Sequence, residues 1–183
     1  MEVLTTDIPG LLLIQPKVFG DLRGYFFESF NAREFSEKTG LDIQFVQDNE
    51  SKSKRGVLRG LHFQNPPFAQ SKLVRVVKGR VLDVAVDIRK NSPTFGHYHA
   101  VELTEDNHLQ FFIPKGFAHG FSVLSDVAVF QYKCDAFYNP QSEGAIAWND
   151  PQLNINWQLN EDEILLSDKD RNHPLFADFV SPF

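Results

Sequence analysis

Residues 113–121 read Ile-Pro-Lys-Gly-Phe-Ala-His-Gly-Phe. The proline and the first glycine are typical of a turn, and the residues after them predict a β-strand. On that strand we expect His119 to point toward the interior of the domain. An inward histidine at this position fits a functional site and equally fits a structural residue with satisfied hydrogen bonds.

The segment around this motif contains one predicted strand after another. Between positions 72 and 135, turn residues recur about every 8–12 residues, which is typical of a β-sandwich or barrel. Residues 77–80 predict a hairpin turn. In the strand predicted at residues 80–88, Asp83 and Asp87 lie on the face opposite the aliphatic side chains. These carboxylates therefore face either solvent or the polar interior of a barrel.

The N-terminal part predicts two more strands and one helix. Residues 11–18 and 24–30 predict short strands, and residues 19–21 predict the turn between them. Asn31 is a suitable N-cap and Gly40 a suitable C-terminal glycine for a helix of one to two turns.

Together these patterns predict one all-β domain over residues 1–183. We expect a jelly-roll, or double-stranded β-helix, barrel with a few short helices. The Pro-x-Gly-x-x-His pattern that ends at His119 resembles the second motif of cupin barrels, which favours this cupin-like fold. Eighteen phenylalanines, four tyrosines and two tryptophans supply rings for its core or for a binding cleft.

Composition and charge argue against several classes of protein. A single cysteine, Cys134, argues against a disulfide framework and a cysteine-rich zinc site. The longest aliphatic run, residues 11–14, is far shorter than a membrane span of about 20 residues, and residues 1–3 lack the pattern of a secretory signal. We therefore expect a cytoplasmic protein with no membrane partner. The formal net charge of −6 disfavours nucleic-acid binding, although a few local cations can still hold a small anion.

A metal site of the cupin type is not supported by the spacing of its candidate ligands. His97 and His99 share a strand face and resemble the first half of such a motif. Glu102 follows His99 by three residues, where the motif requires four or five, so a strand would turn the glutamate to the opposite face. We expect an exposed or structural histidine pair and no metal.

Residues 59–64, Arg-Gly-Leu-His-Phe-Gln, follow a polar stretch and combine a cation, a glycine and a histidine. His62 has the side chain best matched to general-base chemistry near pH 7, and Arg59 presents a planar fork suited to phosphate. Regular alternation would place them on opposite faces, so convergence requires a bend, which Gly60 can provide. Local pattern alone equally fits a surface arginine and a packed histidine.

Two further positions place polar groups on apolar faces. Lys72 continues the inward face of Val74 and Val76, and an ammonium group is costly to bury unless it is paired. Tyr132 aligns with Phe130 and also faces inward. Each fits a site residue, and equally a lysine that extends to solvent or a tyrosine of the core. Residues 19–28 gather four rings, an arginine and two carboxylates, which suits either a nucleotide contact or a hairpin turn.

Several motifs occur together in one order along the chain. They are residues 19–24 (Phe-Gly-Asp-Leu-Arg-Gly), 47–49 (Gln-Asp-Asn), 56–64 (Gly-Val-Leu-Arg-Gly-Leu-His-Phe-Gln), 70–74 (Gln-Ser-Lys-Leu-Val), 114–121, 132–134 (Tyr-Lys-Cys), 138–140 (Tyr-Asn-Pro) with Glu143, and 166–170 (Leu-Ser-Asp-Lys-Asp). In this combination the chain resembles the dTDP-4-dehydrorhamnose 3,5-epimerases over nearly its whole length.

The resemblance implies an isomerase that acts on dTDP-4-dehydro-6-deoxy-D-glucose and forms dTDP-4-dehydro-L-rhamnose, in dTDP-L-rhamnose biosynthesis. The ketone at C4 acidifies the hydrogens on C3 and C5. A base removes each proton to give an enolate, and an acid on the opposite face of the ring returns it. The resemblance implies no cofactor and no metal.

The resemblance also implies roles for individual residues. The base would be His62, polarised by Asp170, with Asp168 as the second choice for that partner. Lys72 would lie near the C4 oxygen, where charge develops, and Tyr132 would deliver the proton. The implied substrate-binding residues are Phe19, Arg23, Phe26, Glu28, Gln47, Asn49, Arg59, His119, Tyr138, Glu143 and Lys169. Among these, Arg23 and Arg59 would hold the diphosphate and Tyr138 would stack on the thymine.

The family resemblance further implies a homodimer that exchanges N-terminal strands, so that Arg23 and Glu28 serve the partner's site. Three alternatives remain at this point. The first is a mono-epimerase that inverts only C3 or only C5 of a related dTDP-4-keto-6-deoxysugar. The second is a non-catalytic cupin module that binds sugar nucleotides. The third is a metal-dependent cupin oxygenase or isomerase.

Overall fold

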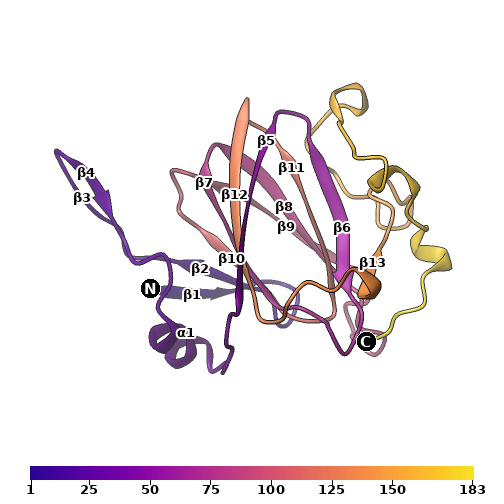
Figure 1. The fold of residues 1–183 in the computed structure, drawn as a ribbon, viewed down its shortest axis with the longest axis horizontal. Coiled ribbons are helices and arrows are strands. Elements are labelled where there is room, and N and C mark those ends of the chain that lie inside the picture. Colours follow the sequence, from indigo (N-terminus) through magenta and orange to yellow (C-terminus); the bar gives the residue numbers. More distant parts are fainter.

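Two antiparallel β-sheets face each other and form the body of the protein, as the computed structural model of residues 1–183 shows (Figure 1). The six-stranded sheet has the order β1 (Glu2–Thr5), β2 (Leu12–Gln15), β10 (Gln110–Ile113), β7 (Lys72–Lys78), β12 (Val127–Cys134) and β5 (Gln47–Lys54). The five-stranded sheet has the order β13 (Glu143–Ala145), β6 (Leu58–Gln64), β11 (Phe117–Val123), β8 (Arg80–Asp87) and β9 (Tyr98–Thr104). This arrangement confirms the predicted jelly-roll class.

Apolar side chains fill the space between the two sheets. Val74 and Phe130 of the six-stranded sheet pack with Ala85 and Phe121 of the five-stranded sheet in one buried cluster. The rings of Phe121 and Phe130 stack with centroids 4.3 Å apart. Burial of these side chains is the main favourable contribution to folding, so the sheets are held face to face.

The residues after β13 cover the outer face of the five-stranded sheet. Leu153, Trp157 and Phe176 join Leu61 and Val84 in a second buried cluster. This segment contains only short 3-10 helices, namely η2 (Glu161–Glu163), η3 (Asp170–Asn172) and η4 (Phe176–Asp178), while η1 (Pro140–Ser142) precedes β13. Because little of this segment forms regular secondary structure, the burial of its side chains holds it against the sheet.

The predicted helix is confirmed as α1 (Ala32–Thr39). The Glu34 N–H donates to the Asn31 side chain over 3.2 Å, and Gly40 adopts the left-handed conformation at φ 72° that ends the helix. Its buried Phe35 packs on Phe112 with ring centroids 5.5 Å apart. The helix thereby covers part of the six-stranded sheet. No helix in the structure is long and apolar enough to cross a membrane.

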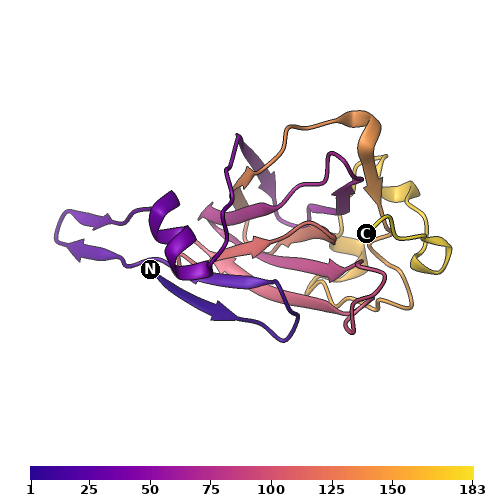
Figure 2. The same cartoon turned by 90° about the horizontal axis from the view of Figure 1, so that it is seen from below.

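The prediction of a turn at residues 19–21 is wrong. These residues form β3 (Phe19–Asp21), which pairs with β4 (Gly24–Phe26), and the turn lies at Leu22 and Arg23. Each predicted strand around it is shorter than expected, because the chain leaves the sheet to build this separate hairpin. The hairpin projects away from the two sheets (Figures 1 and 2).

The predicted hairpin at residues 77–80 is also wrong. A tight turn does occur there, with Gly79 at φ 80° and the position of its missing Cβ only 2.0 Å from the Val127 carbonyl oxygen. However, β7 and β8 on either side of the turn belong to different sheets. The turn residues were read correctly from the sequence, but they do not encode which sheet the next strand joins.

A β-bulge in β6 brings Arg59 and His62 to the same face, as the bend predicted at Gly60 requires. His62 pairs with His119 of β11, and Arg59 pairs with Phe121, so three steps along β6 match two along β11. Gly60 has φ 132°, and a Cβ there would lie 2.5 Å from the Gly120 Cα atom. Glycine is therefore required at this position by both backbone conformation and space.

The carboxylates of β8 face the interior rather than solvent. Asp83 and Asp87 are fully buried. Asp83 accepts a hydrogen bond from His119 over 2.9 Å, and Asp87 pairs with Arg89 over 2.6 Å. Both carboxylates therefore lie in the polar interior of the barrel, which was one of the two predicted environments.

Candidate active site

A cavity of about 120 Å³ opens between the two sheets beside β6. It is lined by Gln47, Asn49, His62, Phe63, Gln64, Gln70, Lys72, Tyr132, Tyr138 and Glu143. Most of these residues were singled out from the sequence. A larger cavity of about 280 Å³ shares Asn49 and Tyr132 with it but contains no histidine. We therefore assign the candidate active site to the smaller cavity.

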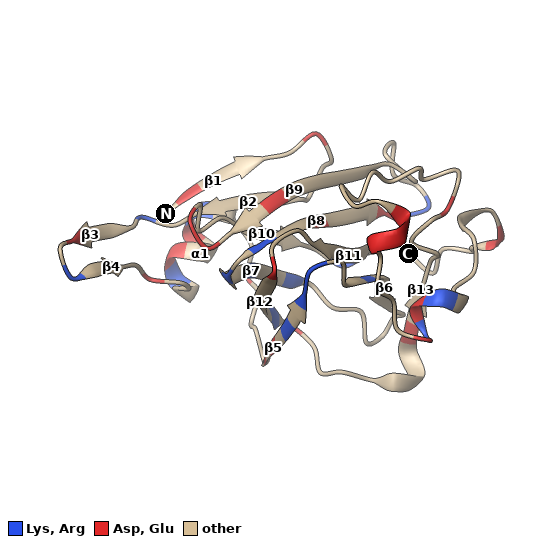
Figure 3. Cartoon of the chain, turned by 90° about the horizontal axis from the view of Figure 1, so that it is seen from above, with Lys and Arg blue, Asp and Glu red and all other residues tan.

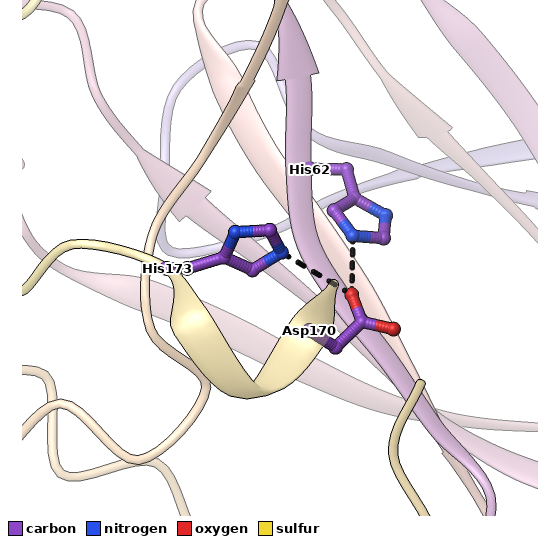
Figure 4. A group of neighbouring side chains, drawn as sticks. All are labelled: His62, Asp170 and His173. Atoms are coloured by element: carbon purple, nitrogen blue, oxygen red, sulfur yellow. Dashed lines mark hydrogen bonds and ion pairs between the residues drawn. The ribbon is translucent and has the colours of Figure 1, made fainter. Parts of the chain in front are cut away.

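His62 and Asp170 form a short polar contact at this site. The His62 Nε2 atom lies 2.6 Å from the Asp170 Oδ1 atom (Figure 4). Because a carboxylate oxygen only accepts hydrogen bonds, the imidazole donates its Nε2–H to it. Asp168, the second choice for this partner, is exposed, and the ion pair of His62 is with Asp170 instead. The aspartate that orients His62 is therefore Asp170.

Asp170 is held as an anion by its surroundings. Ser167 donates its hydroxyl hydrogen to the Asp170 Oδ2 atom over 2.6 Å, while the Asp170 N–H donates to the serine oxygen. Burial alone would raise the pKa of Asp170, but the hydrogen bonds from His62 and Ser167 hold it well below its usual value. The carboxylate is thus charged at neutral pH and faces the imidazole.

His173 is a third member of this group that the sequence interpretation missed. Its Nε2 atom lies 3.3 Å from the same Asp170 oxygen, and its ring packs edge-on against His62 (Figure 4). The sequence signal for this contact is the three-residue spacing between Asp170 and His173, which corresponds to one turn of a 3-10 helix. One potential metal-ligating atom from each of His62, Asp170 and His173 lies within 4.8 Å of the other two, which is close enough to hold a metal ion. Hydrogen bonds account for their arrangement.

Lys72 and Tyr132 reach the cavity from the six-stranded sheet, opposite His62. The lysine Nζ atom lies 5.9 Å from the centre of the tyrosine ring. Burial lowers the pKa of Lys72, and the nearby Cys134 and Asp83 only partly oppose this shift. Burial raises the pKa of Tyr132, so its hydroxyl is protonated at neutral pH. The site thus combines a histidine on one wall with a lysine and a proton donor on the other.

Tyr138, Glu143 and Lys169 form a polar group at the rim of the cavity. Glu143 accepts a hydrogen bond from the Lys169 ammonium, and the Tyr138 hydroxyl lies near the same carboxylate. The Tyr138 N–H donates to the Gln47 side chain over 3.0 Å, and the tyrosine ring is exposed. Burial alone would raise the pKa of Glu143, but its hydrogen bonds hold the value below the usual one. These predicted binding residues therefore lie together.

Arg59 and His119 lie next to the cavity but do not line it. Arg59 donates weakly to Ser53 over 3.3 Å and is exposed. His119 is buried and bonded to Asp83, and burial lowers its pKa despite this carboxylate. Arginines and lysines also follow β5, β7 and β12 (Figure 3). Cationic side chains therefore occur on the strands around the cavity although the chain has a net charge of −6.

The N-terminal candidates do not join this site within one chain. Phe19 and Phe26 pair across the projecting hairpin of β3 and β4, and both rings are exposed. The Arg23 side chain is 90 % exposed and pairs with Asp21 over 2.5 Å. Glu28 contacts Asn31, which caps α1. In a single chain, these four predicted binding residues have no contact with His62.

His99 and Glu102, two members of the cupin-type metal motif, have separate ion-pair partners. His99 pairs with Asp7 over 2.6 Å, and Glu102 lies 3.8 Å from Arg80. These contacts do not bring the histidine and the glutamate together, and they form no three-ligand group.

A jelly-roll barrel with a histidine–aspartate pair opposite a lysine and a tyrosine is an arrangement of the cupin-like class suited to acid–base chemistry. The family model described as dTDP-4-dehydrorhamnose 3,5-epimerase matches residues 5–178. The chain belongs to this family and is an isomerase. Membership in an enzyme family also removes the non-catalytic binding module from the alternatives.

Individual relatives resemble the chain over nearly its full length. The dTDP-4-dehydrorhamnose 3,5-epimerase of Shigella flexneri is 56 % identical over 178 residues, which cover 97 % of each chain. The structure of the Legionella pneumophila dTDP-6-deoxy-D-glucose-3,5-epimerase in complex with dTDP-4-keto-L-rhamnose is 51 % identical, with a TM-score of 0.94. That match covers 98 % of this chain and 94 % of the Legionella chain.

A mono-epimerase shares the fold at lower identity. The 3′-monoepimerase of Streptomyces bikiniensis, solved in complex with dTDP-quinovose, is 35 % identical with a TM-score of 0.88. The match covers 97 % of this chain and 88 % of that chain. The fold is therefore compatible with epimerisation at one carbon or at two. Of the relatives named here, the 3,5-epimerases have the higher sequence identity to this chain.

The contact between His62 and Asp170 generates a paired prediction. Asp170→Asn puts a neutral amide in place of the anion that fixes the imidazole tautomer, so we expect kcat to fall by at least about 100-fold. Asp168→Asn, an equal change two residues away at an exposed position, should stay within about twofold of wild type. Steady-state epimerase assays measure both. Equal losses in the two variants would contradict the assignment of Asp170.

Proposed function

We propose that the chain inverts both C3 and C5 of dTDP-4-dehydro-6-deoxy-D-glucose and yields dTDP-4-dehydro-L-rhamnose, a step of dTDP-L-rhamnose biosynthesis. The observation that carries this proposal is the placement of His62 and Tyr132 on opposite walls of one cavity, with His62 bonded to Asp170. Inversion requires a proton to leave one face of the sugar ring and to return on the other. Two groups on opposed sheets supply that geometry.

In the proposed mechanism, His62 removes the proton from the carbon next to the ketone. The imidazole accepts this proton on the nitrogen that does not face Asp170 and becomes an imidazolium ion. The nearby carboxylate stabilises this positive charge and keeps the ring oriented. Only protons move and no oxidation state changes, so the reaction needs no redox partner.

Lys72 stabilises the enolate in this proposal. Negative charge develops on the C4 oxygen as the proton leaves, and an ammonium group held inside the cavity is already oriented toward that charge. A donor of this kind contributes about 3 kcal/mol to lowering the barrier. This role explains why a lysine, whose pKa burial lowers, occupies the inward face of β7.

Tyr132 acts as the acid on the opposite face of the ring. Burial raises the pKa of this phenol, so it carries a proton to donate at neutral pH. It lies on β12, next to β7, which places it beside Lys72 and across from His62. The enolate is therefore reprotonated from the wall that faces the base.

The residues around the cavity would hold the nucleotide. Gln47, Asn49 and Glu143 line the cavity and offer polar contacts to the thymidine or sugar, and the exposed ring of Tyr138 can stack on the base. Arg59 would bind the diphosphate from the same face of β6 as His62. His119 and Lys169 complete the binding set as flanking contacts.

We also propose a homodimer in which the hairpin of β3 and β4 reaches the partner's cavity. Support comes from the exposed side chains of Phe19, Arg23 and Phe26, which lie apart from the site in their own chain. Strand exchange between identical chains places them at the second site without a change of fold. The cytoplasmic location expected from the sequence stays a prediction.

A mono-epimerase is the second candidate, because the Streptomyces bikiniensis protein shares the fold. Turnover in D2O with proton NMR distinguishes the two activities. The double epimerase incorporates deuterium at both C3 and C5 of the product. Deuterium at only one of these carbons would overturn the double-epimerase proposal and leave the mono-epimerase.

The control for this experiment is His62→Ala. We expect exchange at both carbons to stop, since no other side chain in the cavity replaces the base, while dTDP binding persists in calorimetry. Exchange at the wild-type rate would contradict the role of His62.

The proposed strand exchange predicts complementation between two inactive variants. Arg23→Ala removes a residue from the hairpin, and His62→Ala removes the base. A mixed dimer then contains one intact site, built from the cavity of the first chain and the hairpin of the second. Random pairing on co-expression therefore restores about a quarter of wild-type activity. No recovery in dimers shown by mass spectrometry to be mixed would contradict the exchange.

A further inference from the structure

His173 touches the aspartate of the site without touching the cavity. Its Nε2 atom and that of His62 both face the Asp170 Oδ1 atom, at 3.3 Å and 2.6 Å (Figure 4). The His173 side chain is only 9 % exposed and is absent from the cavity lining. Any effect of His173 on the reaction must therefore pass through Asp170 and His62.

The backbone fixes the position of His173. Asp170 begins the 3-10 helix η3, and His173 follows its last residue with extended backbone at φ −81° and ψ 151°. Pro174 comes next and restricts His173 to this region. The Pro174 carbonyl accepts a hydrogen bond from the Ala147 N–H over 2.8 Å, which ties this turn to the body of the protein. The imidazole is thus placed by the fold.

We propose that His173 is a positioning residue that holds Asp170 in place and limits the basicity of His62. This inference rests on the proposed function, in which His62 is the base. A carboxylate oxygen that already accepts a hydrogen bond from His173 interacts less strongly with the imidazolium form of His62. The two histidines therefore share one acceptor, and the balance between them sets the proton affinity of the base.

The protonation state of His173 is consistent with this role. Burial lowers the pKa of His173 although Asp170 opposes the shift, so the ring is neutral at pH 7. A neutral imidazole that faces a carboxylate oxygen carries its proton on the facing nitrogen and donates it. The ionisable groups around the pair are Asp170 and Lys169 on its own segment, His62 on β6, His119 on β11 and Glu143 on β13.

Removal of His173 changes the interactions of the imidazolium form of His62 in one direction. Asp170 loses a competing donor and attracts the imidazolium form more strongly. At low pH, a positive charge on His173 no longer repels a proton on His62. Water also gains access to the space that the ring occupied, which favours the charged form of His62. All three effects favour the imidazolium form of His62.

The test is the pH dependence of kcat/KM in His173→Ala and His173→Gln. In the alanine variant we expect the acidic limb of the kcat/KM profile to shift to higher pH by about 0.5 unit or more. We expect kcat on the plateau to fall roughly 10-fold, because Asp170 is held less firmly, with KM nearly unchanged. Glutamine offers an amide N–H at the corresponding position, so His173→Gln should restore both the limb and most of kcat.

The matched control is Asn172→Ala, a neutral change at the exposed neighbouring position on η3. It should leave the acidic limb in place. NMR titration of the His62 imidazole in the folded, ligand-free variants measures the same shift without turnover. An unshifted His62 in His173→Ala would overturn the proposal while His62 remains the base. Loss of activity without a shift, unrescued by glutamine, would also overturn it and indicate a structural role.

Discussion

The hydrogen bond between His62 and Asp170 joins residues 108 positions apart and depends on how the tail packs. His62 lies on a strand of the five-stranded sheet, whereas Asp170 lies in a segment with little regular structure. Buried Trp157 and Phe176 hold that segment on the sheet, and the buried Asp150 carboxylate accepts the Phe176 N–H over 2.7 Å. The C-terminal core therefore places Asp170 against His62, the proposed base.

The second constraint is the opposition of the two sheets. A single strand places alternate side chains on opposite faces and cannot direct two catalytic groups at each other. In this barrel, β6 supplies His62 from one sheet, and β7 and β12 supply Lys72 and Tyr132 from the other. The aromatic and aliphatic core between the sheets fixes their separation. The same burial that stabilises the fold thus sets the distance across the cavity.

Residue patterns predicted the parts of the structure that depend on local chemistry. The caps of α1 and the bend at Gly60 follow from side-chain and backbone preferences of single residues. Strand β5 was missed because its residues are all polar, and its pairing with β12 is a long-range contact. The turn at Gly79 was predicted from the sequence. The passage of the chain from one sheet to the other at this turn was not. The contact of His173 with Asp170 was missed, because no pattern shows where an irregular tail folds back.

The most direct test of the account is solvent exchange in Tyr132→Phe, followed by proton NMR in D2O. If His62 removes the proton from one side and Tyr132 returns it from the other, this variant still exchanges the substrate hydrogens at C3 or C5 with solvent. The recovered sugar then keeps its original configuration, because only His62 can return the deuterium. Inversion at the wild-type rate, or no exchange at all, would contradict the assignment of base and acid to opposite walls.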